Sequence, residues 1–100
     1  AQPALMAVSM AVMRVLEQEK GFVLKNKVAL VAGHSLGEYS ALAAAGAFSL
    51  ADTARLLKLR GQAMQKAVPV GQGAMAALLG VGIDVAAKVA AEAAQGDVCQ

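Results

Sequence analysis

Apolar residues recur every three or four positions near the start of the chain, which is the spacing of the buried side of an amphipathic helix. The positions are Leu5, Val8, Val12, Met13 and Leu16. Pro3 suits the first turn of a helix, and Gly21 suits the residue that follows its end. The pattern therefore predicts a helix from Pro3 to about Lys20.

A different pattern follows a connector around residues 24–27. Residues 28–33 read Val-Ala-Leu-Val-Ala-Gly, a short continuous apolar run that ends in glycine. Such a run is typical of a strand that is buried on both faces of a parallel sheet. The next segment, residues 35–45, is small and helix-favouring, and Gly46 is placed to end it. We therefore expect a central parallel strand followed almost at once by a second helix.

The sequence Ser49-Leu50-Ala51-Asp52 resembles the start of a helix. The Ser49 hydroxyl can accept hydrogen bonds from the free amides of the first turn, and the Asp52 carboxylate suits the positive end of the helix dipole. A third helix is therefore predicted from about Leu50 to Lys66.

The composition changes at residues 69–73, Pro-Val-Gly-Gln-Gly, which lack helix formers and indicate a linker between subdomains. Beyond the linker, residues 74–79 are a candidate strand, and residues 96–100 resemble the beginning of another. Asp84 is expected to cap a last helix that runs to about Ala94. The chain is therefore expected to divide near this linker.

Composition and charge exclude several classes of function. Apolar residues make up 58% of the chain and charged residues 16%, so disorder is not expected. The net charge of +2 is scattered along the chain, which does not indicate nucleic-acid binding. The apolar runs are shorter than the roughly 20 residues that span a bilayer, so no membrane segment is expected. One cysteine and one histidine offer neither an internal disulfide nor a zinc site, which favours a cytoplasmic setting.

The segment Gly33-His34-Ser35-Leu36-Gly37 fits the pattern G-x-S-x-G between a predicted strand and a predicted helix. In this context a serine lies in a sharp, strained turn that exposes its hydroxyl, and flanking glycines remove side chains that would collide. The amide of Leu36 would lie at the helix N-terminus, where it can donate to a developing oxyanion. The segment predicts a nucleophilic serine, Ser35. An ordinary turn with a helix-capping serine is the alternative.

A serine nucleophile needs a base, and His34 is the only histidine. Neighbouring side chains across such a turn point in different directions, so His34 is not expected to reach the Ser35 hydroxyl. Its side chain is expected to pack against nearby residues or to support the residues of the site from behind them. The base of a serine enzyme would then lie outside this sequence.

Arg60 falls among the apolar positions of the third predicted helix when successive residues are placed about 100° apart. A buried guanidinium is costly unless it is paired with an anion or well-placed acceptors. An internal ion pair or a side chain that reaches solvent would explain it. The alternative is a ligand carboxylate, which the planar guanidinium can hold through two parallel hydrogen bonds.

Several segments together resemble a known family. They are Gly33-His34-Ser35-Leu36-Gly37-Glu38-Tyr39-Ser40-Ala41-Leu42, Gln2-Pro3-Ala4, Leu59-Arg60-Gly61 and Met64-Gln65-Lys66-Ala67-Val68-Pro69. In identity, order and spacing the chain resembles the malonyl-CoA:acyl-carrier-protein transacylases of bacterial type II fatty acid synthesis. The resemblance implies an α/β fold. Residues 1–69 would be part of an α/β-hydrolase-like core (helix, parallel strand, nucleophile elbow, helices), and residues 70–100 the beginning of a ferredoxin-like subdomain.

The resemblance also implies roles for three residues. Ser35 matches the nucleophile, the Leu36 backbone N–H matches an oxyanion donor, and Arg60 matches the arginine that pairs with the malonyl carboxylate. Malonyl-CoA would be the substrate and acyl carrier protein the acceptor, with no permanently bound cofactor and no metal. The family's histidine base and the glutamines near its oxyanion hole have no match here. The sequence, which does not begin with methionine, therefore resembles an internal fragment that we expect to be inactive by itself.

Two other functions remain open from the sequence. A serine esterase or lipase would share the turn around Ser35 but would have no reason to bury Arg60. A catalytically silent structural or interaction fragment would need neither residue for chemistry.

Overall fold

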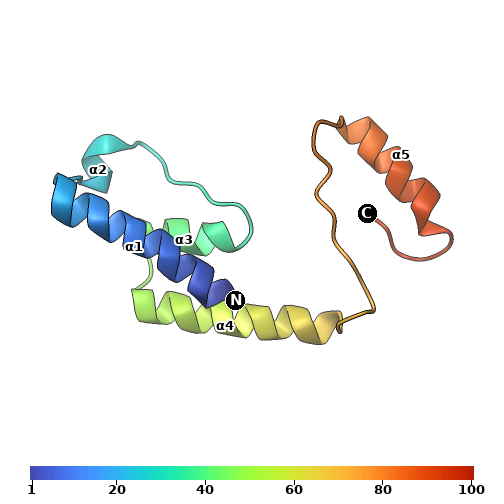
Figure 1. Ribbon diagram of the computed structural model, residues 1–100, viewed down its shortest axis with the longest axis horizontal. Helices are drawn as coiled ribbons and strands as arrows, with labels where there is room; N and C mark the ends of the chain where they lie inside the picture. Colours follow the sequence, from blue (N-terminus) through green and yellow to red (C-terminus); the bar gives the residue numbers. More distant parts are fainter. The chain divides into compact units, whose positions relative to one another are not determined.

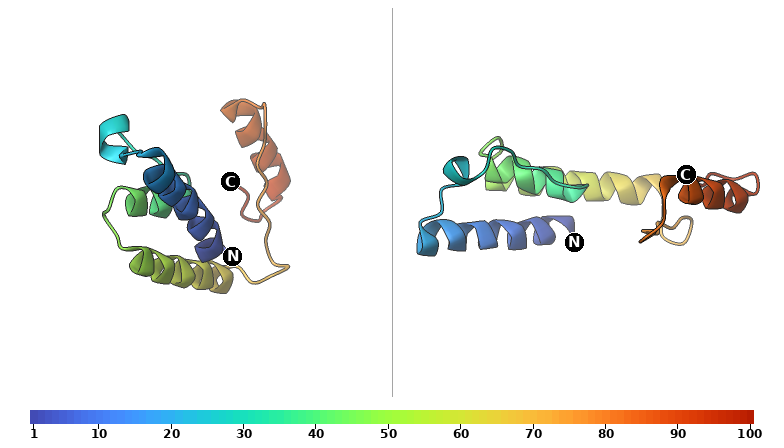
Figure 2. Two further views of the ribbon diagram at one scale, coloured as in Figure 1. Left: turned by 60° about the vertical axis from the view of Figure 1, so that its left-hand side comes forward. Right: turned by 90° about the horizontal axis from the view of Figure 1, so that it is seen from above.

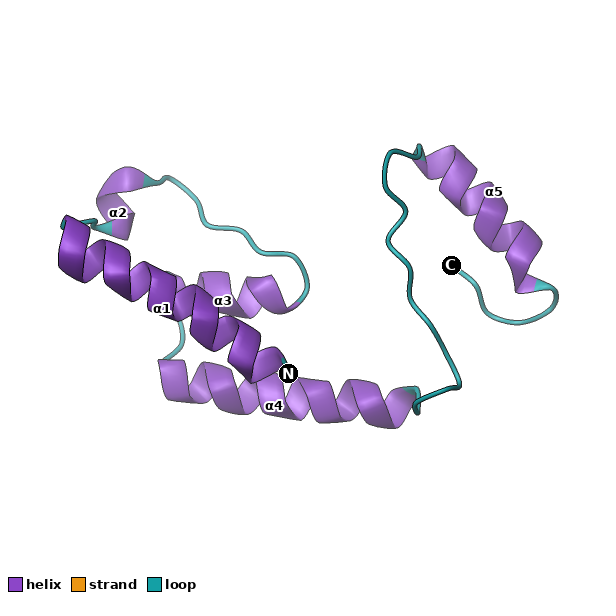
Figure 3. Ribbon diagram, viewed as in Figure 1, coloured by secondary structure: helices purple, strands orange, loops and turns teal.

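The computed structural model describes residues 1–100, which form five α-helices and no β-strand (Figure 3). The helices are α1 (Gln2–Lys20), α2 (Leu24–Lys27), α3 (Leu36–Ala44), α4 (Leu50–Ala67) and α5 (Ile83–Ala94). The chain divides into two compact units, Ala1–Val70 and Gly71–Gln100. The four longer helices were predicted from the sequence to within about two residues at each end.

In the first unit α1 packs against both α3 and α4, and α3 packs against α4 (Figures 1 and 2). Its small core contains one or two buried side chains from each of the three helices. They are Met6 from α1, Ala43 from α3, and Thr53 and Leu57 from α4. This packing brings the first turn of α1 beside the middle of α4, where the candidate site lies.

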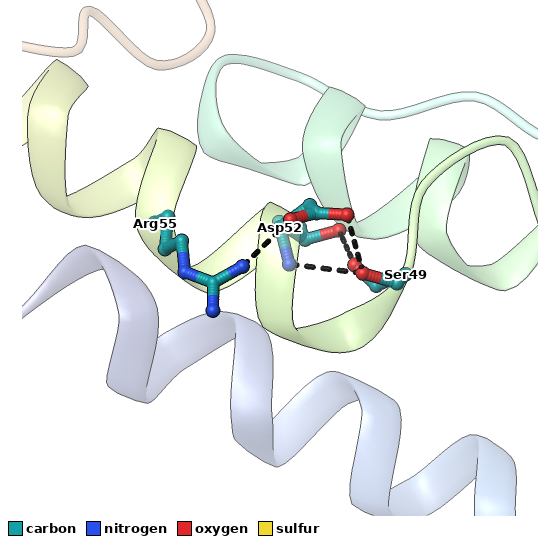
Figure 4. A network of polar contacts seen from close by, with 4 residues as sticks. Ser49, Asp52 and Arg55 are labelled. Atoms are coloured by element: carbon teal, nitrogen blue, oxygen red, sulfur yellow. Dashed lines mark hydrogen bonds and ion pairs between the residues drawn. The ribbon is translucent and has the colours of Figure 1, made fainter.

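The start of α4 is fixed by a local polar network (Figure 4). The Asp52 amide donates to Ser49 Oγ at 3.0 Å, and that hydroxyl donates to Asp52 Oδ2 at 2.7 Å. Arg55 Nη1 lies 2.8 Å from Asp52 Oδ1. The Ser49 hydrogen bond, and then Arg55, hold the pKa of the Asp52 carboxyl below its usual value. The predicted cap is confirmed, and it sets where α4 begins.

The predicted strands are not formed. Residues 28–33, 74–79 and 96–100 have no regular secondary structure. A strand requires a neighbouring backbone to satisfy its N–H and C=O groups, and no segment of these 100 residues pairs with them. Leu30, in the centre of the first run, is 88% exposed. An apolar run predicts a segment suited to a sheet, but it does not supply the partner.

Two local predictions differ from the structure. Residues Leu24–Lys27 form the single turn α2 where a connector was expected. Four residues are too few to show helical periodicity. Gly82, rather than Asp84, is the N-cap of α5, and no side chain caps this end. Asp84 lies instead in the first turn, where a carboxylate still suits the helix dipole. None of the helices combines the length and apolar character needed to cross a bilayer.

Candidate active site

Ser35 occupies a strained turn immediately before α3. The Gly37 amide donates to the His34 carbonyl at 2.9 Å, which closes a four-residue turn. Ser35 has φ 56° and ψ −118°, values close to the first central position of a type II′ turn. Residues other than glycine rarely adopt a positive φ, and such residues cluster at functional sites. The strained turn predicted around Ser35 is therefore present, although the segment before it is not a strand.

The two glycines of the motif differ in what surrounds them. A Cβ added at Gly33 would overlap the backbone carbonyl of Gly37 and the amide of Glu38. A Cβ added at Gly37 would meet nothing within 4 Å. Glycine was predicted to be needed on both sides of Ser35. The structure requires it for lack of space at Gly33, which lies against the first turn of α3, but not at Gly37.

Ser35 is the N-cap residue of α3, but its side chain makes no capping hydrogen bond. The capping interpretation of this serine is therefore wrong, and its hydroxyl is available for other contacts. The Leu36 amide is the first of α3 and donates no hydrogen bond within the chain. An unpaired amide beside the hydroxyl, at the positive end of a helix, is the arrangement expected of an oxyanion donor.

Arg60 reaches the serine from α4. Its Nη2 donates to Ser35 Oγ at 2.8 Å, while Nη1 donates to Oε1 of Gln2 at 2.5 Å. Its guanidinium carbon lies 5.8 Å from the centroid of the Tyr39 ring, within the range of a cation–π contact. The two candidate site residues, Ser35 and Arg60, are thus joined by a contact between the turn before α3 and the helix α4.

Sequence reasoning from residue types did not select Gln2 or Tyr39 for this site. Tyr39 follows Ser35 by four residues, a spacing that places both on one side of the helix and could have indicated their proximity. No local signal links Gln2 to Arg60, because their contact depends on how α1 packs on α4.

The charge on Arg60 has only neutral partners. The ion pairs of the chain are Asp52–Arg55 and Lys88–Glu92, and neither includes Arg60. The internal ion pair considered from the sequence is therefore wrong. Arg60 is half-buried and is held by an amide, a hydroxyl and an aromatic ring. Neutral acceptors satisfy hydrogen bonds without cancelling the positive charge, so the guanidinium can still attract an anion.

The His34 side chain makes no hydrogen bond to Ser35, but it is exposed, so the expectation that it packs is wrong. Its backbone carbonyl, rather than its imidazole, takes part in the turn. No group of three or more His, Cys, Asp or Glu residues lies close enough to hold a metal ion. The described residues therefore bring together a hydroxyl, a free amide and a guanidinium, but no base.

Residues 1–98 match the acyl transferase domain family. The chain is 50% identical over 97 residues to the malonyl CoA-acyl carrier protein transacylase of Escherichia coli strain K12, a match that covers 97% of this chain and 30% of that protein. It is 51% identical over 81 residues to the transacylase of the same name from Bacillus subtilis strain 168. That match covers 81% of this chain and 24% of the Bacillus protein.

Two solved structures are similar to this chain. One is the acyl-carrier-protein-S-malonyltransferase of Bartonella henselae, which superposes on this chain with a TM-score of 0.87 and is 60% identical to it. The match covers 100% of this chain and 32% of the Bartonella chain. The other is the acyl carrier protein S-malonyltransferase of Vibrio cholerae, with a TM-score of 0.75 and 50% identity. This match covers 95% of this chain and 30% of the Vibrio chain. The chain thus spans about 30% of the length of these relatives. With the match over residues 1–98, these similarities show that the chain belongs to the acyl transferase domain family.

Proposed function

We propose that the protein carrying this chain transfers a malonyl group from coenzyme A to acyl carrier protein through an ester on Ser35. The observation that carries the proposal is the contact between Arg60 and Ser35, which places an unneutralised guanidinium 2.8 Å from the candidate nucleophile. The names of the relatives, malonyl transacylases and malonyltransferases, support this choice of substrate and acceptor.

In the first half-reaction Ser35 Oγ attacks the thioester carbonyl. The bond from Oγ to the acyl carbon forms, the carbon–sulfur bond breaks, and the hydroxyl proton ends on the sulfur of coenzyme A. The Leu36 amide donates to the carbonyl oxygen while it carries negative charge. The thiol sulfur of the carrier protein then attacks the ester carbonyl. The carbon–sulfur bond forms, the bond from the acyl carbon to Oγ breaks, and the thiol proton ends on Oγ, which restores the Ser35 hydroxyl.

The position of Arg60 favours a short diacid. A malonyl ester on Ser35 carries its carboxylate on the carbon next to the carbonyl, only a few bonds from Oγ. Because Nη2 already touches Oγ, a small displacement of the guanidinium brings it onto that carboxylate. A planar guanidinium can grip a carboxylate through two parallel hydrogen bonds. An acetyl group has no carboxylate to receive this contact.

The fold proposed for the whole protein is α/β-hydrolase-like. Residues 28–33 would be a strand in a parallel sheet whose neighbours come from further chain, and residues 70–100 would begin a ferredoxin-like subdomain. Residues 28–33 are apolar but exposed, and Leu30 at their centre is 88% exposed. This exposed apolar surface supports the proposal that the segment pairs with strands from further chain. The cytoplasmic setting stays a prediction, as does the inactivity of the 100 residues alone.

A serine esterase would share the turn around Ser35. It would gain nothing from a guanidinium that is held beside the nucleophile by neutral partners, and the names of the relatives do not favour it. A silent fragment would not require the positive φ of Ser35.

Incubation of the full-length protein with malonyl-CoA, followed by intact-mass measurement, tests the proposal. A malonyl adduct that maps to Ser35 and disappears in Ser35→Ala is expected. Ser9→Ala, which removes an exposed helix serine, is the control and should retain the adduct. An adduct that persists at full yield in Ser35→Ala would overturn the assignment.

A further inference from the structure

The hydrogen bond from Arg60 to Ser35 joins the group proposed to recognise substrate with the group proposed to attack it. A cationic donor on Oγ occupies one of the two lone pairs of the hydroxyl and withdraws electron density from the oxygen. Such a serine is a weaker nucleophile than one that only donates its proton to a base. In the unliganded structure, recognition and attack therefore compete for the same oxygen.

Formation of the ester must end this contact. After acylation Oγ is bonded to the acyl carbon, which takes the space around it, and an ester oxygen is a poor hydrogen-bond acceptor. Gln2 holds Nη1 of Arg60, so Nη2 can leave Ser35 while the guanidinium stays in the site. The Tyr39 ring supports the cation and offers no competing negative charge.

The carboxylate of an incoming acyl group would outcompete the serine hydroxyl for Nη2, because a guanidinium binds a charged acceptor more strongly than a neutral one. An acyl donor without a carboxylate leaves Arg60 on Ser35. The carboxylate would then both bind the substrate and free the nucleophile.

We propose that the Arg60–Ser35 contact is a restraint on the nucleophile that the carboxylate of the acyl donor releases. The inference rests on the proposed function and deepens it, because selection for a carboxylated acyl group then acts on the rate of serine attack as well as on binding. Gln2 is the positioning residue that keeps Arg60 in the site during the exchange.

Labelling of the full-length protein with an uncharged organophosphorus fluoride, diisopropyl fluorophosphate, tests the restraint. In this reaction the bond from Ser35 Oγ to phosphorus forms, the phosphorus–fluorine bond breaks, and fluoride and the hydroxyl proton leave. Arg60→Met keeps the bulk of the side chain but removes its donors, and should accelerate labelling of Ser35 by about threefold to tenfold, the effect of losing one hydrogen bond. Arg55→Met is the matched control on the same helix, because Arg55 pairs with Asp52 and does not contact Ser35, and it should leave the rate unchanged.

A second measurement uses the wild-type protein alone and does not depend on the folding of a variant. A fluorophosphonate that bears a carboxymethyl group should show a higher maximal rate of inactivation than its methyl ester, because its carboxylate draws Arg60 from Ser35. If Arg60 served binding only, the carboxylate would lower the half-saturating concentration and leave the maximal rate equal.

Equal maximal rates, or labelling of a folded Arg60→Met variant that is no faster than labelling of the wild type, would overturn the restraint. The uncharged probe reports on the Arg60–Ser35 contact whether or not malonyl-CoA acylates the protein. A missing malonyl adduct would therefore count against the proposed function, while the labelling rates would count for or against the restraint.

Discussion

Gln2, at the start of α1, accepts a hydrogen bond from Arg60 of α4, a residue 58 positions later in the chain. This contact sets the direction of the guanidinium, because Nη1 is engaged by Gln2 while Nη2 faces Ser35. Gln2 Nε2 also lies 3.4 Å from the Met64 sulfur, one turn further along α4. The packing of α1 on α4 thus supports the polar contacts at the candidate active site.

Replacing Gln2 by glutamate is expected to suppress malonyl transfer selectively. The new carboxylate would pair with Arg60 and neutralise the charge that attracts the substrate. We expect kcat/KM for malonyl-CoA to fall at least tenfold, with a smaller effect on acetyl-CoA, when both are measured with the full-length protein. Gln62→Glu places the same charge on the exposed side of α4 and should change neither value appreciably. Equal losses for both substrates in Gln2→Glu would contradict a role in positioning Arg60.

Gly33→Ala is expected to destabilise the protein by about 1–3 kcal/mol, the usual cost of overpacking. The added Cβ would overlap the backbone at Gly37 and Glu38, which cannot rotate away as a side chain can. Urea denaturation measures the free energy of unfolding. Gly61→Ala is the matched control, since its Cβ would lie 3.8 Å from the Gln2 side chain and alanine favours the helix interior. A Gly33→Ala protein as stable as the wild type would contradict the close approach of Gly33 to the backbone of Gly37 and Glu38.

Stability should depend on the ionisation of Asp52. Ser49 and Arg55 hold the pKa of this carboxyl below its ordinary value of 3.8, so its contribution is present above that value and is lost as the pH falls toward the lower folded pKa. Asp52→Asn should therefore lower the Tm at pH 7, and the difference from wild type should shrink as the pH falls below 3.8. Glu17→Gln, which removes an exposed carboxylate without an ion pair, is the control. A difference in Tm between wild type and Asp52→Asn that stays constant down to about pH 2 would show that stability does not depend on the ionisation of Asp52.

The helices could be predicted from the sequence because their signals are local. The Ser49 cap and the left-handed Gly21 lie next to the helices they delimit. The strand at residues 28–33 could not be established in the same way, since a strand exists only when another backbone pairs with it. Ser35 was identifiable from its motif, and Arg60 from its position among apolar residues. Their contact, and the part played by Gln2, depend on the packing of distant helices, which no short pattern encodes.

The central claim is that Arg60 selects for a carboxylated acyl group. The specificity constants for malonyl-CoA and acetyl-CoA, measured with full-length wild type and Arg60→Ala, test it most directly. Loss of a charge-assisted contact should cost about 2–5 kcal/mol for malonyl transfer, a decrease of tens to thousands of times, and should spare or improve acetyl transfer. A malonyl-to-acetyl ratio unchanged by the substitution, with a lower Tm, would show instead that Arg60 only supports the fold.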